Sequence, residues 1–319
     1  MNYPAQHKTI IRRRSKKHAK RIPRKRRVGI LTALLLVLVG TLMIAYPIAS
    51  DYLNRVEQEK VIESQEQVVK ETPAEDLSAY MQAAKDYNAR LLAGSTYVID
   101  PFDPNYEQGA SNEEYLSCLN LAGDGVMGTI SIPAIGVNLS ITHGTEGDAM
   151  NHAVGHVTNT SLPVGGASTH AVLAGHTGLP SAVIFDRLDQ LQVGDYFVIQ
   201  VLGEEHAYEV NSTEVVLPDE TTSLGVVEGE DLITLVTCTP YGVNSHRLLV
   251  HAKRCDIPQD WIERKANKQS TPLFAQDIAD GGISPFLMGV LLALAILIVL
   301  LIVRLIKARR SKGIRGGAR

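Results

Sequence analysis

The stretch DLITLVTCTPYGVNSHRLLV, residues 231–250, places a nucleophile near a cation. Cys238 ends an apolar, strand-like run, and the turn-forming residues 239–242 that follow bring the end of such a strand to the surface. The next apolar run begins at Arg247. If the two runs pair, a guanidinium lies near the thiol, where a cation lowers the thiol pKa and makes it nucleophilic. The alternative is a buried, unreactive cysteine, because free cysteine is often a core residue.

A cysteine nucleophile needs a base, and histidine is the natural candidate. His176 stands between two glycines at the end of the apolar stretch HAVLAG. Small neighbours at a strand end let the backbone of a ligand approach closely. His170, six residues earlier, lies on the same strand face by period-two counting, and a structural role is favoured for it. The pattern therefore predicts His176 as the partner of Cys238.

Short strands separated by turns fill the chain from Gly128 onward, which predicts a mainly β fold, either a closed barrel or a sandwich. Before them, residues 51–71 contain no Gly or Pro and predict a helix. Thr72 is the expected N-cap of a second helix that ends near Gly94. The two Asp-Pro pairs that follow predict a long loop, and long loops in compact chains are often functional.

The charge is sorted by region, although the net charge is only −3. Residues 1–27 contain twelve Lys or Arg and no acid, and residues 304–319 contain seven more. Uncharged apolar segments at 28–48 and 285–303 adjoin these tails, and each is long enough to cross a bilayer. Basic flanks face the cytoplasm, so the pattern predicts a two-pass membrane protein with both termini cytoplasmic and the middle outside.

These segments also fit two other interpretations. A cleaved signal peptide would explain the first segment, and AYPIAS could serve as a cleavage site, but its apolar core is longer than a signal peptide needs. Nucleic-acid binding would explain the basic tails, but their position beside apolar segments favours the membrane instead. The middle contains three cysteines, Cys118, Cys238 and Cys255. A disulfide between Cys118 and Cys255 is left open, because spacing alone does not fix the geometry of a bridge.

Several motifs together resemble class C sortases, the pilus-assembling branch of the cysteine transpeptidases of Gram-positive surfaces. Residues 234–250 resemble the TLxTC signature and the arginine strand after it, and residues 156–188 resemble the histidine segment. Residues 119–145 resemble the first barrel strands, and DPF at 100–102 resembles the lid motif. One departure is Thr177, because an arginine often follows the histidine in this class.

The resemblance implies an eight-stranded sortase barrel with N-terminal helices and two flanking transmembrane helices. It implies Cys238 as nucleophile, His176 as general acid/base and Arg247 as the cation that holds substrate or oxyanion. Asp100 and Phe102 would form a lid, facing the arginine and covering the cysteine. The implied reaction cleaves an LPXTG-like sorting signal through a thioacyl enzyme, and a pilin lysine amine then resolves it. Surface proteins and pilin subunits are the implied partners, and no cofactor or metal is implied.

Three alternative functions also fit part of the sequence. A housekeeping sortase would attach proteins to a cell-wall precursor, but the lid motif and the second apolar segment argue against it. An L,D-transpeptidase would require an SHGC-type motif, which the sequence lacks. A non-enzymatic two-span scaffold would explain the anchors and leave the Cys, His and Arg segments unexplained.

The predicted organisation, in chain order, is a cytoplasmic tail at 1–27, a transmembrane helix at 28–48, a helical spacer at 49–95, a lid loop and lead-in at 96–127, the catalytic barrel at 128–255, a linker at 256–284, a second transmembrane helix at 285–303 and a cytoplasmic tail at 304–319.

Overall fold

The computed structural model describes residues 24–94, 98–103, 113–146 and 149–268, together with Ile296, Val299 and Val303. The chain divides into two units, one made of Met1–Met43 with Gly289–Arg319 and the other of Ile44–Met288. Residues 1–23 and 269–319 lie outside the described part, except for Ile296, Val299 and Val303. They include nearly all of both basic tails, most of the second apolar segment and most of the linker at 256–284.

Four α-helices are described: α1 (Arg24–Glu71), α2 (Ala74–Ala93), α3 (Glu113–Ser117) and α4 (Gln259–Lys268). The predicted helix at 51–71 is confirmed and continues without a break from the apolar segment before it. Within the described residues, one helix is long and apolar enough to cross a membrane, at Leu35–Glu71, where an 18-residue stretch has a mean hydropathy of 1.6. The part of α1 from residue 51 onward is held to the strands by polar contacts. For example, Gln58 Oε1 accepts hydrogen bonds from the backbone N–H of Ser140 at 2.9 Å and from its hydroxyl at 2.8 Å.

The start of α2 differs from the prediction. Its N-cap is Pro73, with no side-chain hydrogen bond to the helix, so the expected capping by Thr72 is wrong. The Thr72 hydroxyl instead donates to the carbonyl of Val68 at 2.7 Å, in the last turn of α1. The Thr72 side chain thus serves the last turn of α1, and no side chain caps the first turn of α2.

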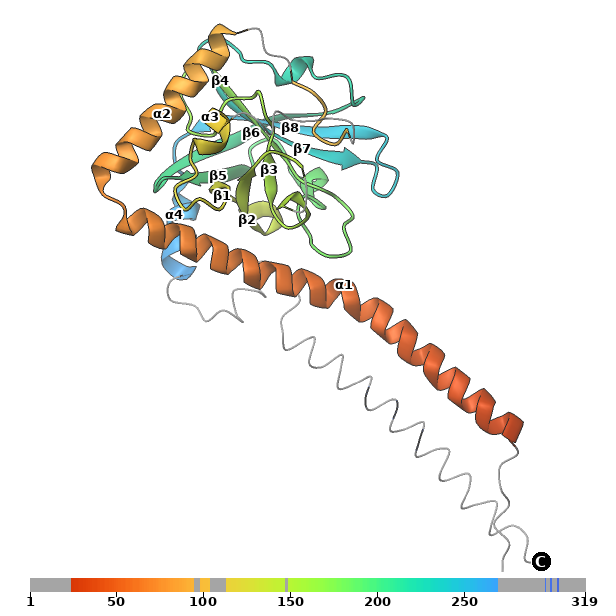
Figure 1. The fold of residues 1–319 in the computed structure, drawn as a ribbon. Helices are drawn as coiled ribbons and strands as arrows, with labels where there is room; N and C mark the ends of the chain where they lie inside the picture. Colours follow the sequence, from red (N-terminus) through yellow and green to blue (C-terminus); the bar gives the residue numbers. More distant parts are fainter. Residues whose placement is uncertain are drawn as a thin grey trace, which may run out of the picture. The chain divides into compact units, whose positions relative to one another are not determined.

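Eight strands close into a barrel in the order β1-β2-β3-β4-β7-β8-β6-β5 (Figure 1). Their bounds are β1 (Val126–Ile132), β2 (Val137–His143), β3 (Val154–His156), β4 (Thr169–Ala174), β5 (Tyr196–Val201), β6 (Glu204–Val216), β7 (Asp231–Thr239) and β8 (His246–Cys255). Four 3-10 turns lie between them: η1 (Pro133–Ile135), η2 (Ala149–Asn151), η3 (Leu188–Gln190) and η4 (Thr222–Leu224). The pairs β2–β3 and β4–β7 are parallel, and the others are antiparallel. This confirms the predicted eight-stranded barrel with N-terminal helices.

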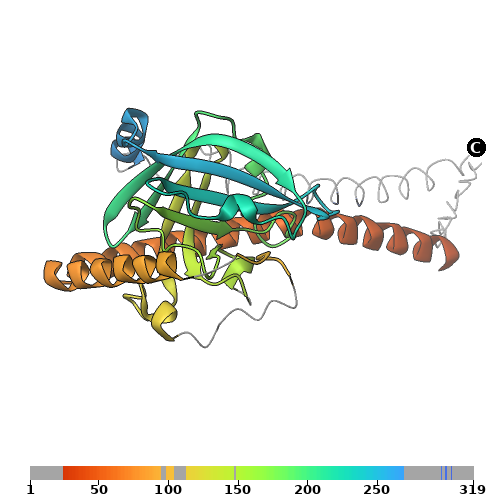
Figure 2. The same cartoon turned by 90° about the horizontal axis from the view of Figure 1, so that it is seen from above.

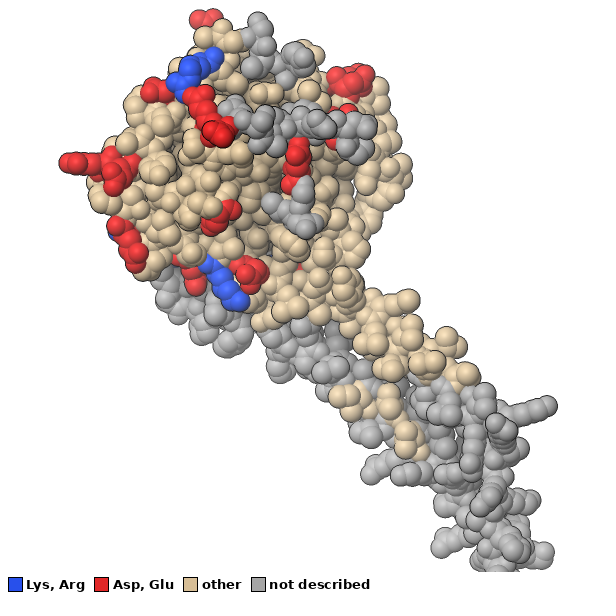
Figure 3. Space-filling model, in the orientation of Figure 1, with Lys and Arg blue, Asp and Glu red and all other residues tan. Residues whose placement is uncertain are grey.

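Apolar side chains of alternating strand residues fill the barrel, as the period of a strand requires. A second, smaller apolar cluster contains Val172 and Ala174 of β4, Val236 of β7 and Leu249 of β8, with Leu224 of η4 packed beside them. Figure 2 shows the long strands β6 and β8 curving together along one side of the barrel. Acidic side chains outnumber basic ones on the face drawn in Figure 3, which agrees with the acidic middle of the sequence.

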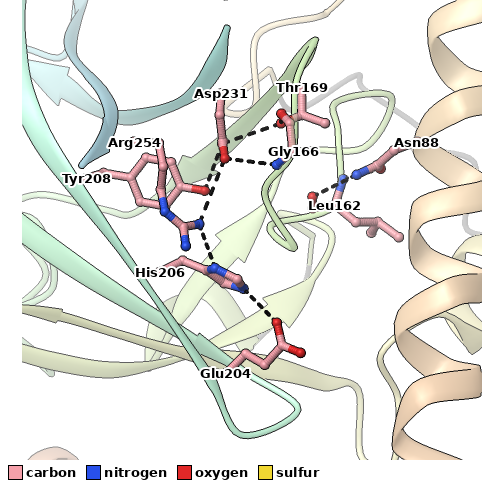
Figure 4. A network of polar contacts seen from close by, with 9 residues as sticks. All are labelled: Asn88, Leu162, Gly166, Thr169, Glu204, His206, Tyr208, Asp231 and Arg254. Atoms are coloured by element: carbon pink, nitrogen blue, oxygen red, sulfur yellow. Dashed lines mark hydrogen bonds and ion pairs between the residues drawn. The ribbon is translucent and has the colours of Figure 1, made fainter. Parts of the chain in front are cut away.

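A polar network fastens the start of β7 to its neighbours (Figure 4). Asp231 accepts hydrogen bonds from the hydroxyl of Tyr208 at 2.9 Å and from the backbone N–H of Gly166 at 2.8 Å. The guanidinium of Arg254 lies 3.8 Å from the same carboxylate. Cys238 lies seven residues further along β7, roughly 23 Å away at about 3.3 Å per residue. This network therefore stabilises the end of the barrel opposite the cysteine.

Candidate active site

The strand register brings Cys238 and Arg247 together. They are directly opposed on the antiparallel pair β7–β8, and Cys238 is only 9% exposed. The parallel pair β4–β7 aligns Ala174 with Val236. His176 and Cys238 each follow two residues later, so both lie where these two strands end. The three residues predicted from the sequence thus meet at one end of the barrel.

The turn that carries His176 is held from both sides. The backbone N–H of Gly175 donates to Val236 O at 3.0 Å, and the Thr237 hydroxyl donates to Gly175 O at 2.8 Å. The backbone N–H of Phe185 donates to His176 O at 3.1 Å. A Cβ at position 175 would lie 2.6 Å from Phe185 Cδ2, so the close packing requires glycine there. Sequence reasoning missed the role of Thr237, although it is the threonine directly before the cysteine in the quoted motif.

Arg247 is fixed by four hydrogen bonds. Its Nη1 donates to the carbonyls of Asn244 at 3.1 Å and His246 at 3.0 Å. Its Nε and Nη2 donate to the two carboxylate oxygens of Asp100, at 2.8 and 2.6 Å. The Arg247 and Asp100 side chains are 10% and 9% exposed. This bidentate ion pair joins residues 147 positions apart and turns the guanidinium toward the segment that was predicted as a lid.

The segment 98–103 lies over this end of the barrel (Figure 1). The ring of Phe102 is 5.4 Å from the ring of His176, centroid to centroid, and its centroid is 5.2 Å from Arg247 Cζ. Phe102 and Val98 pack against the second apolar cluster. The carbonyl of Val98 also accepts a hydrogen bond from Thr221 at 2.9 Å. Phe102 therefore covers His176 and Arg247 while Asp100 occupies the donors of the guanidinium.

Burial determines the protonation of the cysteine and the histidine. Desolvation raises the pKa of Cys238, Asp100 raises it further, and Arg247 only partly opposes them. Arg247 lowers this pKa, as expected, but burial has the larger effect in the closed arrangement, so the net shift of the Cys238 pKa is upward. Desolvation also lowers the pKa of His176. The covered site accordingly favours a neutral thiol beside a neutral imidazole.

The other candidate residues lie elsewhere. All three cysteines are free thiols, so Cys118 and Cys255 are not bridged. The ring of His170 is hydrogen-bonded to Gly225 O and to the Thr234 hydroxyl, away from Cys238. Within the described ranges, no cluster of three or more His, Cys, Asp or Glu side chains could hold a metal ion.

A closed barrel with a cysteine, a histidine and an arginine at one strand end is the architecture of a cysteine transpeptidase. A protein-family model described as the sortase domain matches residues 130–255. Sortase C-1 from Actinomyces oris is 48% identical, with a TM-score of 0.52, over 57% of this chain and 99% of that one. Sortase C1 from Streptococcus agalactiae is 38% identical, with a TM-score of 0.57, over 62% of this chain and all of that one.

Among curated proteins, sortase D of Bacillus subtilis is 28% identical over 130 residues, which are 40% of this chain. The match spans 63% of the length of that relative. The chain belongs to the sortase family. Its similarity to solved sortases named C-1 and C1 places it in class C of that family.

Proposed function

We propose that the protein is a transpeptidase that joins pilin subunits. The observation that carries the proposal is the meeting of Cys238, His176 and Arg247 at one end of the barrel, under a segment whose carboxylate is bound to the arginine. The structure of sortase C from Streptococcus pneumoniae, a structural neighbour at 34% identity, is described as giving insight into pilin substrate specificity. The substrate class is an LPXTG-like sorting signal, as the sequence resemblance implies.

The reaction begins when the lid leaves and Arg247 is free to donate hydrogen bonds. The Cys238 sulfur attacks the threonine carbonyl of the sorting signal, and Arg247 stabilises the oxyanion that forms. His176 transfers the thiol proton to the leaving amine as the C–N bond breaks and a C–S thioester bond remains. A lysine amine of the next subunit then attacks the thioester. A new C–N bond forms, the C–S bond breaks, and the proton of the amine returns to the enzyme through His176.

Membrane attachment is part of the proposal. The apolar portion of α1 serves as one anchor and the segment 285–303 as the second, with both basic tails in the cytoplasm. Protease added to protoplasts should digest residues 51–283 and leave both tails intact. Cleavage of a tag placed at Arg319 from outside would contradict the two-anchor topology.

The function is tested with the full chain in detergent, a sorting-signal peptide and a pilin substrate. Mass spectrometry should find a thioacyl adduct on Cys238, and electrophoresis should show a ladder of covalent polymers. Cys238→Ala should abolish both, and His176→Ala should lower turnover by about 10²–10⁴-fold. Transfer only to a cell-wall precursor would indicate a housekeeping role. Absence of any adduct would indicate a non-enzymatic scaffold and would refute the proposal.

A further inference from the structure

The histidine loop, residues 175–187, connects β4 to η3 and carries His176 near its start. The hydrogen bonds described above hold the chain before His176 to β7. After His176, the backbone N–H of Gly178 donates to Asp186 Oδ1 at 2.9 Å. The backbone N–H of Ile184 donates to Asp186 Oδ2 at 3.2 Å. One half-buried carboxylate therefore joins the chain just after the histidine to the segment where the loop returns.

The returning segment of the histidine loop is a fixed support for His176. Ile184 and Phe185 are fully buried in the barrel core, and the N–H of Phe185 donates to His176 O at 3.1 Å. The N–H of Val183 donates to Asp51 Oδ1 of α1 at 2.9 Å. Three consecutive backbone N–H groups are thus bound to three different acceptors. The second half of the loop is therefore anchored to the core and to α1 as well as to the histidine.

Gly178 also connects the histidine loop with the turn that follows the cysteine. Its φ of +79° lies in the left-handed region that glycine adopts readily. A Cβ built on Gly178 would lie 3.2 Å from Tyr241 Cε2, so the tyrosine ring lies directly against this glycine. Tyr241 follows Cys238 by three positions, and the same turn contains Asn244, whose carbonyl accepts from Arg247. The position of Gly178 therefore affects how the histidine loop packs against the turn between β7 and β8.

We propose that Asp186 is a positioning residue that fixes His176 relative to Cys238 by binding the backbone of Gly178 and Ile184. The proposal rests on the proposed function, in which His176 transfers the thiol proton to the leaving amine. Such a transfer requires hydrogen-bond distances, and a misplacement of about 1 Å can lower a rate by about 10²-fold. Asp186 acts through two backbone N–H groups, so the loss of its carboxylate should affect the reaction far more than the binding of substrate.

The first test separates acylation from binding. The full-length protein in detergent is mixed with excess sorting-signal peptide, and mass spectrometry follows the formation of the thioacyl adduct on Cys238. At saturating peptide, Asp186→Ala should lower the rate of adduct formation by about 10- to 100-fold. The Kd of the same peptide, measured in the Cys238→Ala background, should change by less than about twofold when Asp186→Ala is added.

Two further variants separate the role of the two hydrogen bonds from a general effect of charge. Asp186→Asn removes the charge but keeps one oxygen that accepts from a backbone N–H. It should recover part of the lost rate, because one of the two bonds remains, and it replaces Asp186→Ala if that variant does not fold. Asp189→Ala is the matched control, because it removes an exposed carboxylate from η3, three positions further on. It should form the adduct at the parental rate.

Amide hydrogen exchange over residues 177–185 gives a readout that requires no substrate. Exchange there should be about tenfold faster in Asp186→Ala than in the parent, while exchange over β6 stays unchanged. Parental exchange or parental acylation in Asp186→Ala would overturn the proposal. Equal losses of acylation rate and peptide affinity would indicate a general structural role and would also overturn it. If the parent formed no adduct, the proposed function would fail, and the exchange measurement would still show whether Asp186 holds the loop.

Discussion

Removing the carboxylate of Asp100 should uncover Cys238. In the closed arrangement, Asp100 makes two charge-assisted hydrogen bonds to Arg247, and both side chains are about nine-tenths buried. Hydrogen bonds to charged groups contribute about 1.5–3 kcal/mol each, but Arg247 regains water when the lid opens, which offsets part of this. We therefore assign about 2–3 kcal/mol to the pair. Asp100→Ala should then raise the open fraction of a closed lid by about 30- to 150-fold.

The assay is the alkylation rate of Cys238 by a small thiol reagent. All three cysteines are free, so the rate must be followed by mass spectrometry on the peptide that contains Cys238. Cys255 provides an internal standard, because it lies at the end of β8 away from the lid and should alkylate at the same rate in every variant. Asp103→Ala is the matched control, since it removes an exposed carboxylate from the same segment.

Two effects contribute to the expected rate, and pH separates them. Lid opening raises access at every pH, whereas loss of the Asp100 charge also lowers the pKa of Cys238, because this carboxylate raises that pKa in the closed site. Asp100→Asn removes the same charge but keeps one acceptor for Arg247, so any difference between Asp100→Asn and Asp100→Ala reports lid opening. Equal alkylation rates in wild type and Asp100→Ala would refute the lid argument and leave the roles of the catalytic residues unaffected.

Three further predictions concern the site and the barrel. Gly175→Ala would place a Cβ 2.6 Å from Phe185, so we expect displacement of His176 and a loss of turnover of about tenfold or more, measured with peptide binding as control. Arg247→Lys should also turn over poorly, because an ammonium lacks the planar fork of donors, and wild-type turnover would contradict this. Burial lowers the pKa of His156 from 6.5 to about 4. The folded state should therefore lose about 3 kcal/mol as pH falls from about 6.5 to about 4, and a Tm that is flat over this range would contradict the prediction.

Local sequence patterns were enough to predict much of the fold and part of the site. Alternating apolar residues identified the strands, and the turn at 239–242 placed Cys238 and Arg247 on neighbouring strands, where the structure pairs them. The helix at 74–93 followed from its composition and flanking residues. These features are determined by residues close together in the chain, and local sequence patterns therefore predict them.

Two kinds of feature could not be predicted from local patterns: those that depend on how deeply a side chain is buried, and contacts between residues far apart in the chain. The pKa of Cys238 depends on how deeply the barrel and lid bury the thiol, and no spacing in the sequence reports that depth. The bonds from Thr234 to both His170 and His251 require the parallel pairing of β4 with β7, which joins strands far apart in the chain. The contact of Asp100 with Arg247 was available only from family resemblance.

Arg247 connects protection of the thiol with activity. Under the proposed mechanism, the donors that stabilise the oxyanion are the same Nε and Nη2 groups that Asp100 occupies in the closed arrangement. Under that mechanism, the segment 98–103 competes with the transition state for the guanidinium while Phe102 lies against His176 and Arg247. If the proposed mechanism holds, a sorting signal displaces Asp100 and Phe102 before Cys238 reacts, so the apparent affinity for that signal is reduced by the closed fraction of the enzyme. The same closure keeps Cys238 as a neutral thiol, which is less prone to alkylation or oxidation than a thiolate. Under the proposed mechanism, protection of Cys238 and slower substrate entry have one cause. The guanidinium of Arg247 binds Asp100 in the closed arrangement and the oxyanion during the reaction.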